Sequence, residues 1–331
     1  MTSVTLVEVA PRDGFQAVST FIPTPEKIAA VEMLADAGFR RVEVGAFVSP
    51  AAIAQFADIA DVIDKTDSLD GLRRQVLVPN RKGVALALAA GIRDLCWVVS
   101  VSESHNLNNV RCSVEQSLIN FETAWKEFGQ EVDFLRFNLA TTFDCPFEGR
   151  VDEAAVVQII ERVLALVPKV EFGLCDTTGR AATDHVEVFS DRLLGAYGGN
   201  LVKFAFHGHD TYHLGIGNAL AAYRAGLRVF DVAAAGLGGC PFAPGASGNT
   251  ASEDLVFAFE HMGVSTGIDM RALLVAADRL AAIAPDQAGG RVRHVPRSRV
   301  LSGFGQNATG LRGDSESRHR EDDSAGCACI L

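Results

Sequence analysis

Eight short apolar runs, each followed by a stretch with helical periodicity, constrain the fold of this chain more than any other feature. The runs are rich in Val, Leu, Ile and Phe and largely lack polar alternation, which is typical of strands buried on both faces. They are Val4–Val9, Arg41–Gly45, Gln75–Val78, Leu95–Val101, Phe134–Leu139, Val170–Leu174, Val202–Phe206 and Val229–Ala233. Strands of this kind belong to parallel sheets, in which a helix connects one strand to the next.

The segments between the runs predict helices. The first, Pro25–Ala37, follows Thr24, which we expect to be its N-cap, and has Pro at its first position. Gly38, Gly91 and Gly226 each follow the end of a predicted helix, where a left-handed cap favours glycine. The other predicted helices are Ala51–Lys65, Arg81–Ala90, Val114–Phe128, Asp152–Val167, Ala182–Ala196, Leu214–Ala225 and Ala251–His261.

Eight strand–helix units predict a closed (β/α)8 TIM barrel rather than an open doubly wound sheet. A barrel of this type takes about 250 residues, and the chain has 331. We expect the barrel domain to span residues 1–285, including an extra C-terminal helix at Asp269–Ala284. Residues 286–331 then form a C-terminal extension. Its polar sequence has no apolar periodicity, so we expect a flexible polar tail from about residue 303.

Composition and charge exclude several function classes. The net charge of −11 argues against a nucleic-acid partner, because phosphate neutralisation needs a basic face. No apolar run reaches the roughly 18 residues that span a bilayer, and Met1–Val4 shows no basic region of a secretory signal. We therefore expect a cytoplasmic protein with no membrane partner. The odd number of scattered cysteines fits a reduced compartment: they are Cys96, Cys112, Cys145, Cys175, Cys240, Cys327 and Cys329.

Polar residues at the strand ends predict a metal site, because TIM-barrel chemistry lies at the carboxyl ends of the strands. In the stretch FHGHDTYHLGIGN, His207 and His209 alternate by two, so both side chains can point to the same side. Asp13 follows the first strand and Asn249 follows the eighth, and these strands become neighbours when the barrel closes. This mixed nitrogen and oxygen set suits a six-coordinate ion such as Mg²⁺, Mn²⁺ or Co²⁺. The alternative is a pair of histidines with ordinary hydrogen-bond partners.

Four stretches carry a resemblance to a known family: VEVAPRDGFQ, VEVGAFVSP, FHGHDTYHLGIGN and AGLGGCPFAPGASGNTASEDLV. Together they make the chain similar to the 3-hydroxy-3-methylglutaryl-CoA lyases, which belong to a wider group of metal-dependent TIM-barrel lyases, synthases and aldolases. The resemblance runs from about Val4 to Ile283. The glycine-rich loop is its most diagnostic part, whereas the His-x-His pair is shared with the synthases.

The resemblance implies a role for several residues by position. Arg12 matches the arginine that neutralises the enolate oxygen, and Cys240 matches a loop cysteine that helps in proton transfer. Glu43 and Asp176 match polar residues that orient the ligands or the substrate. Gln16 matches a residue near the arginine, so we expect Arg12 and Gln16 to bind substrate. The residues that match the family's metal ligands are Asp13, His207, His209 and Asn249.

Further candidates come from the residues themselves. Asn138 and Thr141 stand at the end of the fifth strand, and His213 adds a titratable group near the mouth of the barrel, so we expect all three to bind substrate. His207 is also a candidate proton shuttle. A metal-bound imidazole has only one other nitrogen for that second role.

The chain departs from the family pattern around the expected acyl pocket. Cys175 stands before Asp176 where the family often has Gly, and Ala51 stands where a Lys often follows the Phe-Val-Ser-Pro stretch. The residues that match the metal ligands and the loop cysteine are retained. We therefore expect an enzyme that cleaves a related 3-hydroxyacyl thioester, for which 3-hydroxy-3-methylglutaryl-CoA itself is a poorer substrate.

The activity that the resemblance implies is retro-Claisen cleavage with a divalent cation, Mg²⁺ or Mn²⁺, as cofactor. The substrate would be 3-hydroxy-3-methylglutaryl-CoA or a related 3-hydroxyacyl-CoA, and the products acetyl-CoA or another acyl-CoA and a keto compound. Two alternatives are an aldolase or an acyl-CoA-dependent condensing synthase on the same scaffold. A third is a binding protein that kept the barrel without the reaction. The resemblance also implies a homodimer.

Overall fold

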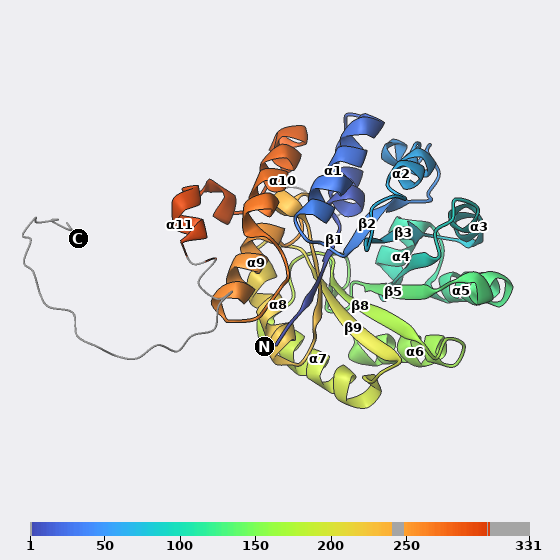
Figure 1. The fold of residues 1–331 in the computed structure, drawn as a ribbon. Helices are drawn as coiled ribbons and strands as arrows, with labels where there is room; N and C mark the ends of the chain where they lie inside the picture. The colour runs from blue at the N-terminus through green and yellow to red at the C-terminus, as the bar shows by residue number, and fades with distance from the viewer. Residues whose placement is uncertain (1, 240–247, 303, 305–331) are drawn as a thin grey trace, which may run out of the picture.

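The structure is a computed structural model that describes residues 2–239, 248–302 and 304. Eight parallel strands form its centre: β1 (Thr5–Glu8), β2 (Arg41–Ala46), β3 (Arg73–Val78), β4 (Asp94–Ser100), β5 (Phe134–Ala140), β8 (Val170–Asp176), β9 (Val202–Gly208) and β10 (Val229–Val232). They close into a barrel in the order β1-β10-β9-β8-β5-β4-β3-β2 (Figure 1). The closed parallel barrel confirms the predicted fold, and all eight strands lie where the apolar runs predicted them.

Helices surround the barrel, as Figure 1 shows. They are α1 (Thr24–Asp36), α2 (Ile59–Lys65), α3 (Arg81–Ala89), α4 (Glu103–Val110), α5 (Val114–Phe128), α6 (Glu153–Leu164), α7 (Thr183–Tyr197), α8 (Gly215–Arg224), α9 (Ser252–His261), α10 (Met270–Ile283) and α11 (Arg297–Leu301). Helix α10 is the predicted extra C-terminal helix. Gly38, Gly91 and Gly226 have φ of 105°, 83° and 107°, so the prediction of left-handed glycines after three helices is confirmed.

The predicted helix Ala51–Lys65 is wrong in its first half. A 3₁₀ turn at Ala54–Phe56 precedes α2, which begins only at Ile59. The turn directs Gln55 inward, where its side chain bonds Val18 O at 2.8 Å, Thr20 O at 2.6 Å and Ile22 N at 3.0 Å. These bonds satisfy the backbone of the loop before α1. A contact between segments therefore overrides the local helical pattern.

The predicted N-cap of the first helix is also wrong. Pro23 occupies the N-cap position and Thr24 is the first helical residue. The Thr24 hydroxyl donates to Asp58 Oδ2 at 2.7 Å instead of capping its own helix. Helix α4 was not predicted, because its polar sequence offers little apolar periodicity. The short hairpin of β6 (Asp144–Cys145) and β7 (Gly149–Arg150) was not predicted either.

The interior of the barrel is polar at its centre. Five buried side chains on five different strands are joined by hydrogen bonds and ion pairs: Arg41, Gln75, Arg136, Glu171 and Asp231. The outer faces of the strands are apolar and pack against the helices. Figure 1 shows this arrangement of strands inside and helices outside. The charged side chains inside the barrel were not expected from the apolar runs.

The first part of the C-terminal extension packs on the barrel domain. Gln287 Nε2 donates to Ala17 O at 2.6 Å, and the Phe304 ring lies 6.0 Å from the Phe257 ring, measured between centroids. The predicted flexible tail lies outside the described residues except for residue 304. The boundary at residue 285 stays a prediction.

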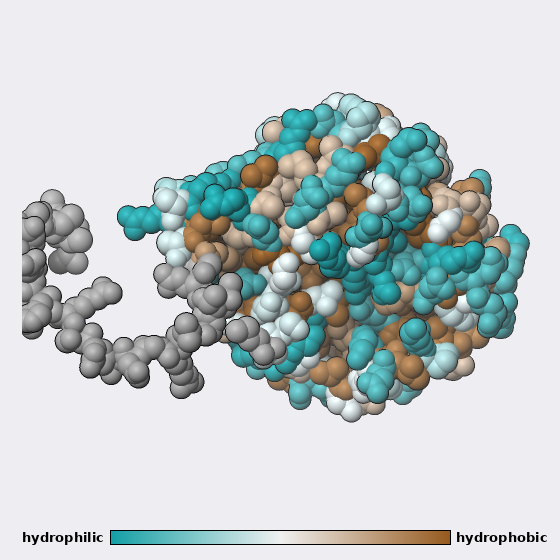
Figure 2. Space-filling model, viewed as in Figure 1, coloured by the Kyte–Doolittle hydropathy of each residue, from teal (hydrophilic) through white to brown (hydrophobic). Residues whose placement is uncertain are grey.

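The described surface is mixed in character. On the face in Figure 2, hydrophobic residues lie in small groups among hydrophilic ones, which is ordinary for a folded protein. Within residues 2–239 and 248–302, no helix has the length and apolar character needed to cross a membrane.

Candidate active site

Three buried side chains at the carboxyl ends of two strands form a candidate metal centre. Asp13 lies in the π-helical turn Ala10–Gly14 after β1, whereas His207 lies in β9 and His209 directly after it. One ligand atom from each residue lies within 4.8 Å of those of the other two. All three side chains are buried. The structure therefore brings together three of the four predicted metal ligands.

Asn249 joins this cluster from the segment after β10. Its Nδ2 donates to Asp13 Oδ2 at 2.8 Å and to Leu237 O at 2.9 Å. Its Oδ1 and His209 Nδ1 are buried and have no hydrogen-bond partner among the described residues. An unpaired buried polar atom costs about 1–3 kcal/mol. The other ring nitrogen, His209 Nε2, lies 3.5 Å from Asp13 Oδ2. A cation bound beside Asp13 by oxygen and nitrogen donors would give Asn249 Oδ1 a partner, so these residues fit a divalent ion.

The protonation states favour cation binding. Burial works to raise the pKa of Asp13, but Arg12 and then His209 outweigh it, so the pKa of this carboxyl lies well below its usual range. Burial lowers the pKa of His209 despite the opposing effect of Asp13. Asp13 is therefore ionised and His209 neutral at pH 7, and these are the forms that bind metals.

Arg12 lies between two carboxylates, that of Asp13 in the same turn and that of Glu43 on β2. Its Nη1 donates to Asp13 Oδ1 at 2.5 Å and its Nε to Glu43 Oε1 at 2.8 Å. Burial opposes the charge of Arg12, but Asp13 and Glu43 outweigh it and the pKa of the guanidinium rises. Glu43, by contrast, has its pKa raised, by burial first and by Asp231 next. The pair fixes a cationic group beside the candidate metal centre.

The imidazole of His207 is oriented by Asp231 on the neighbouring strand β10. Its Nδ1 lies 3.2 Å from Asp231 Oδ2. A carboxylate accepts hydrogen bonds, so Nδ1 carries the proton and Nε2 keeps the lone pair. Asp231 was not among the predicted site residues. A carboxylate inside an apolar strand was the available signal, since a buried charge needs a partner.

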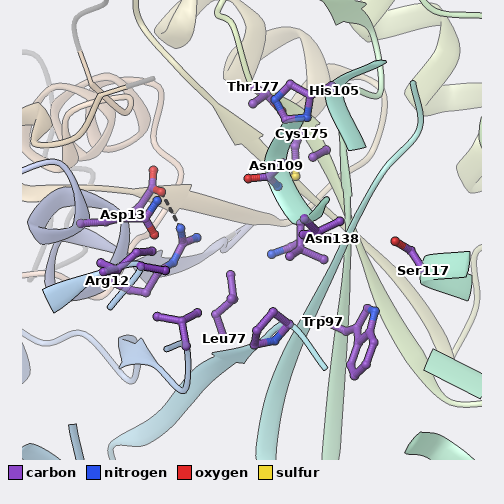
Figure 3. Close-up of a pocket in the computed structure, with 18 of the residues that line it drawn as sticks. Arg12, Asp13, Leu77, Trp97, His105, Asn109, Ser117, Asn138, Cys175 and Thr177 are labelled. Carbon is purple, nitrogen blue, oxygen red and sulfur yellow. Dashed lines mark hydrogen bonds and ion pairs between the residues drawn. The ribbon is translucent and has the colours of Figure 1, made fainter. Parts of the chain in front are cut away.

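A cavity of about 490 Å³ opens onto this cluster. Figure 3 shows Arg12 and Asp13 on one side of it, Ser117 and Trp97 on the other, and Asn138 between them. The cavity is also lined by Gln16, Cys175, His207 and His209. Of the predicted substrate contacts, Arg12, Gln16 and Asn138 thus face the cavity.

Three other candidates do not line the cavity. The Asp176 carboxylate accepts hydrogen bonds from the backbone N–H groups of Arg180 and Ala181, and its pKa is raised to about 6, chiefly by burial. Thr141 is buried and its hydroxyl donates to a backbone carbonyl, whereas His213 is exposed and lies 3.5 Å from Asp210. The contacts of Asp176 and Thr141 stabilise the backbone that follows their strands. Direct contact with substrate stays a prediction for Asp176, Thr141 and His213.

Cys240 lies outside the described residues, so its predicted role stays a prediction. The described cysteines, Cys96, Cys112, Cys145 and Cys175, are all free thiols. Burial is the main cause that raises the pKa of Cys175, so this cavity-lining thiol is protonated.

Comparison with known proteins agrees with this geometry. The model of the HMGL-like family matches residues 3–280 of this chain. The chain belongs to the HMGL-like family. Mitochondrial hydroxymethylglutaryl-CoA lyase of Rattus norvegicus is 36% identical over 275 residues, which cover 83% of this chain and 84% of the relative. The (R)-citramalyl-CoA lyase of Chloroflexus aurantiacus is 38% identical over 296 residues, which cover 85% and 91%.

A solved structure supports the same relationship. An HMG-CoA lyase from Acinetobacter baumannii, in complex with coenzyme A and 3-methylmalate, matches with a TM-score of 0.82 at 35% identity, covering 94% of this chain and 98% of that one. The chain is an enzyme of the carbon–carbon lyase class. The relatives of nearly equal identity differ in the thioester that their names give.

Proposed function

We propose that this enzyme cleaves 3-hydroxy-3-methylglutaryl-CoA or a related 3-hydroxyacyl-CoA, with Mg²⁺ or Mn²⁺ as cofactor. The observation that carries this proposal is the buried cluster of Asp13, His207 and His209 beside Arg12, at the floor of a cavity. A base takes the proton of the C3 hydroxyl, with His207 as the predicted shuttle, and the C2–C3 bond of the acyl group breaks. It releases a keto compound and the enolate of acetyl-CoA or another acyl-CoA, which is then protonated at C2.

The candidate metal ligands are Asp13, His207, His209 and Asn249. A divalent cation held by these residues would lower the pKa of the C3 hydroxyl and help to orient the C2–C3 bond. His207 has one ring nitrogen that is not engaged by Asp231, so that nitrogen serves one role. We assign it to the cation, and the proton-shuttle role of His207 stays a prediction.

Arg12 stabilises the charge that the reaction creates. As the C2–C3 bond breaks, negative charge moves to the thioester oxygen. The guanidinium is permanently charged, and Glu43 and Asp13 hold it in place at 2.8 and 2.5 Å. A preorganised donor aimed at a developing oxyanion is worth about 3–4 kcal/mol of barrier. Glu43 thus acts by orienting Arg12.

The cavity residues define how the acyl group is held. Asn138 and Gln16 offer hydrogen-bond donors along the wall. Cys175 occupies the position directly before Asp176, beside His207 in the neighbouring strand. These side chains support the expectation that the acyl pocket accepts a thioester related to, but different from, 3-hydroxy-3-methylglutaryl-CoA. Cys240 remains the proposed proton donor to C2.

The test is product analysis with two thioesters. Full-length protein is incubated with 3-hydroxy-3-methylglutaryl-CoA or (R)-citramalyl-CoA, and released acetyl-CoA and the keto product are measured by mass spectrometry. We expect acetyl-CoA from at least one thioester, loss of the reaction in EDTA, and recovery with Mn²⁺ or Mg²⁺. A metal-loaded, folded protein that cleaves neither thioester would contradict the proposal.

The same product analysis with other substrates decides between the alternatives. Thioester-independent release of pyruvate from a keto acid would indicate an aldolase, and formation of a condensed thioester from acetyl-CoA would indicate a synthase. The homodimer implied by the resemblance stays a prediction, which analytical ultracentrifugation of the same preparation tests.

A further inference from the structure

Arg136 is a fully buried arginine that makes three separate contacts inside the barrel. It lies on β5, and its Nη2 donates to Asp231 Oδ1 at 2.7 Å. Its Nη1 donates to Glu171 Oε1 at 2.7 Å and its Nε to Asn138 Oδ1 at 3.1 Å. The guanidinium is planar and rigid, so these three partners are fixed relative to one another.

The first contact leads to the candidate metal centre. Asp231 uses one carboxylate oxygen for Arg136 and the other for His207 Nδ1, at 2.7 and 3.2 Å. The bond to Arg136 restricts rotation of the carboxylate, and the carboxylate in turn sets which nitrogen of His207 carries the proton. Partners of this kind change metal affinity by about 10–100-fold when they are removed.

The second contact leads to the substrate cavity. Arginine donates hydrogen bonds and accepts none, so the Asn138 atom that faces Arg136 is the amide oxygen. The amide nitrogen then keeps its hydrogens for another acceptor, and Asn138 lines the cavity between Arg12 and Trp97 (Figure 3). Gly173 makes this position possible, because a Cβ on Gly173 would lie 2.1 Å from Asn138 Oδ1.

We propose that Arg136 is a positioning residue for both halves of the site. Through Asp231 it sets the tautomer and orientation of His207 for the cation, and directly it turns the Asn138 amide so that an N–H donates to an oxygen of the acyl group. Arg136 itself neither lines the cavity nor belongs to the candidate metal ligands. The substrate half rests on the proposed function, whereas the metal half does not.

Arg41 provides a matched control inside the same network. It is also buried and also pairs with Glu171, at 2.8 Å, but the described contacts of its guanidinium do not include Asp231 or Asn138. Lysine keeps the charge of either arginine and loses the planar fork. Comparison of Arg136→Lys with Arg41→Lys therefore separates positioning from the general effect of disturbing buried charges.

The metal half is tested without substrate. Metal-free full-length protein is titrated with Mn²⁺, and free Mn²⁺ is followed by electron paramagnetic resonance. We expect Arg136→Lys and Asp231→Asn to raise the Kd for Mn²⁺ by about 10–100-fold. Arg41→Lys and Asn138→Ala are expected to change it by less than about twofold. Equal loss of affinity in Arg41→Lys and Arg136→Lys would overturn the inference, as would unchanged affinity in Arg136→Lys.

The substrate half is tested at saturating Mn²⁺ with the thioester that the wild type cleaves. We expect Arg136→Lys and Asn138→Ala to raise KM by about tenfold, equivalent to about 1.4 kcal/mol of lost binding. The double variant is expected to show little further increase, because both changes remove the same amide contact. Additive effects of the two changes would overturn this half.

Folding of each variant is checked by circular dichroism. If Arg136→Lys does not fold, the charge-balanced variant Arg136→Met with Glu171→Met takes its place, since apolar residues of similar volume can replace a buried ion pair. The same losses are expected, and normal Mn²⁺ affinity and KM would overturn the inference. A wild type that cleaves neither thioester refutes the proposed function, while the Mn²⁺ titration still decides the metal half.

Discussion

Glu253 gives a stability prediction that can be worked through from its surroundings. This carboxyl group is buried on α9, where Oε2 accepts a hydrogen bond from the backbone N–H of Ala235 at 3.0 Å. Its Oε1 has no partner among the described residues. Burial raises the pKa of Glu253 to about 8, and the nearby Asp254 and Glu8 carboxylates add to this. Ionisation of Glu253 therefore costs stability.

The sign and size follow from the difference between folded and unfolded states. Between pH 4.5 and about 8 the unfolded chain has lost the Glu253 proton and the folded protein has kept it. Stability then falls as pH rises, and the fall ends above the folded pKa. Each pKa unit corresponds to about 1.4 kcal/mol. A shift from 4.5 to about 8 thus predicts a loss of roughly 4–5 kcal/mol in the free energy of unfolding.

The measurement is urea unfolding of wild type and Glu253→Gln at pH 5, 7 and 9 in EDTA. All other groups titrate in both proteins, so the difference between the two curves isolates Glu253. We expect Glu253→Gln to gain several kcal/mol relative to wild type between pH 5 and pH 9. The surface variant Glu187→Gln, which loses an exposed pair with Arg224, serves as control and is expected to show no such gain. A constant difference between wild type and Glu253→Gln would refute the reasoning.

Three further predictions concern the site. Arg12→Gln is expected to lower kcat by about 10²–10³-fold, because it removes the charge facing the developing enolate; steady-state kinetics checks this, and an unchanged kcat contradicts it. Asn249→Ala is expected to raise the Kd for Mn²⁺ by about 10–100-fold, measured on metal-free protein, and wild-type affinity would exclude Asn249 as a ligand. Gly173→Ala places a Cβ 2.1 Å from Asn138 Oδ1. It is expected to raise KM by about tenfold with little change in kcat, and an unchanged KM would exclude contact of Asn138 with substrate.

The barrel was predictable because its strands are nearly continuous apolar runs. A strand of that kind must be covered on both faces, as in a parallel sheet surrounded by helices. Prediction failed where a distant contact decides the backbone. Gln55 is the clearest case, since its hydrogen bonds to Val18, Thr20 and Ile22 hold a 3₁₀ turn in a segment with helical composition. The sequence around Gln55 does not predict these partners, because they lie more than 30 residues away along the chain.

The metal cluster was predictable for a geometric reason. Parallel strands end at one face of a barrel, so Asp13 after β1 and His207 in β9 are expected to converge. Asn249 lies well beyond the end of β10 and reaches the cluster through an isolated bridge with His209. The direction of a side chain after a strand end is different, because loop conformation sets it. Asp176 illustrates this: it follows the rule for position, yet its carboxylate bonds the backbone of its own loop.

The buried ion pairs link the stability of the barrel to its chemistry. Two arginines and two carboxylates balance their charges inside the barrel: Arg41, Glu171, Arg136 and Asp231. We call this chain of ion pairs the column, and its last carboxylate, Asp231, contacts His207. Desolvation of these charges opposes their attraction, and apolar residues of similar volume would stabilise the barrel about as well. Stability alone therefore does not account for the column. The positioning role proposed for Arg136 offers the reason, because fixed donors and acceptors would hold the His207 imidazole in one tautomer and turn the Asn138 amide toward the cavity.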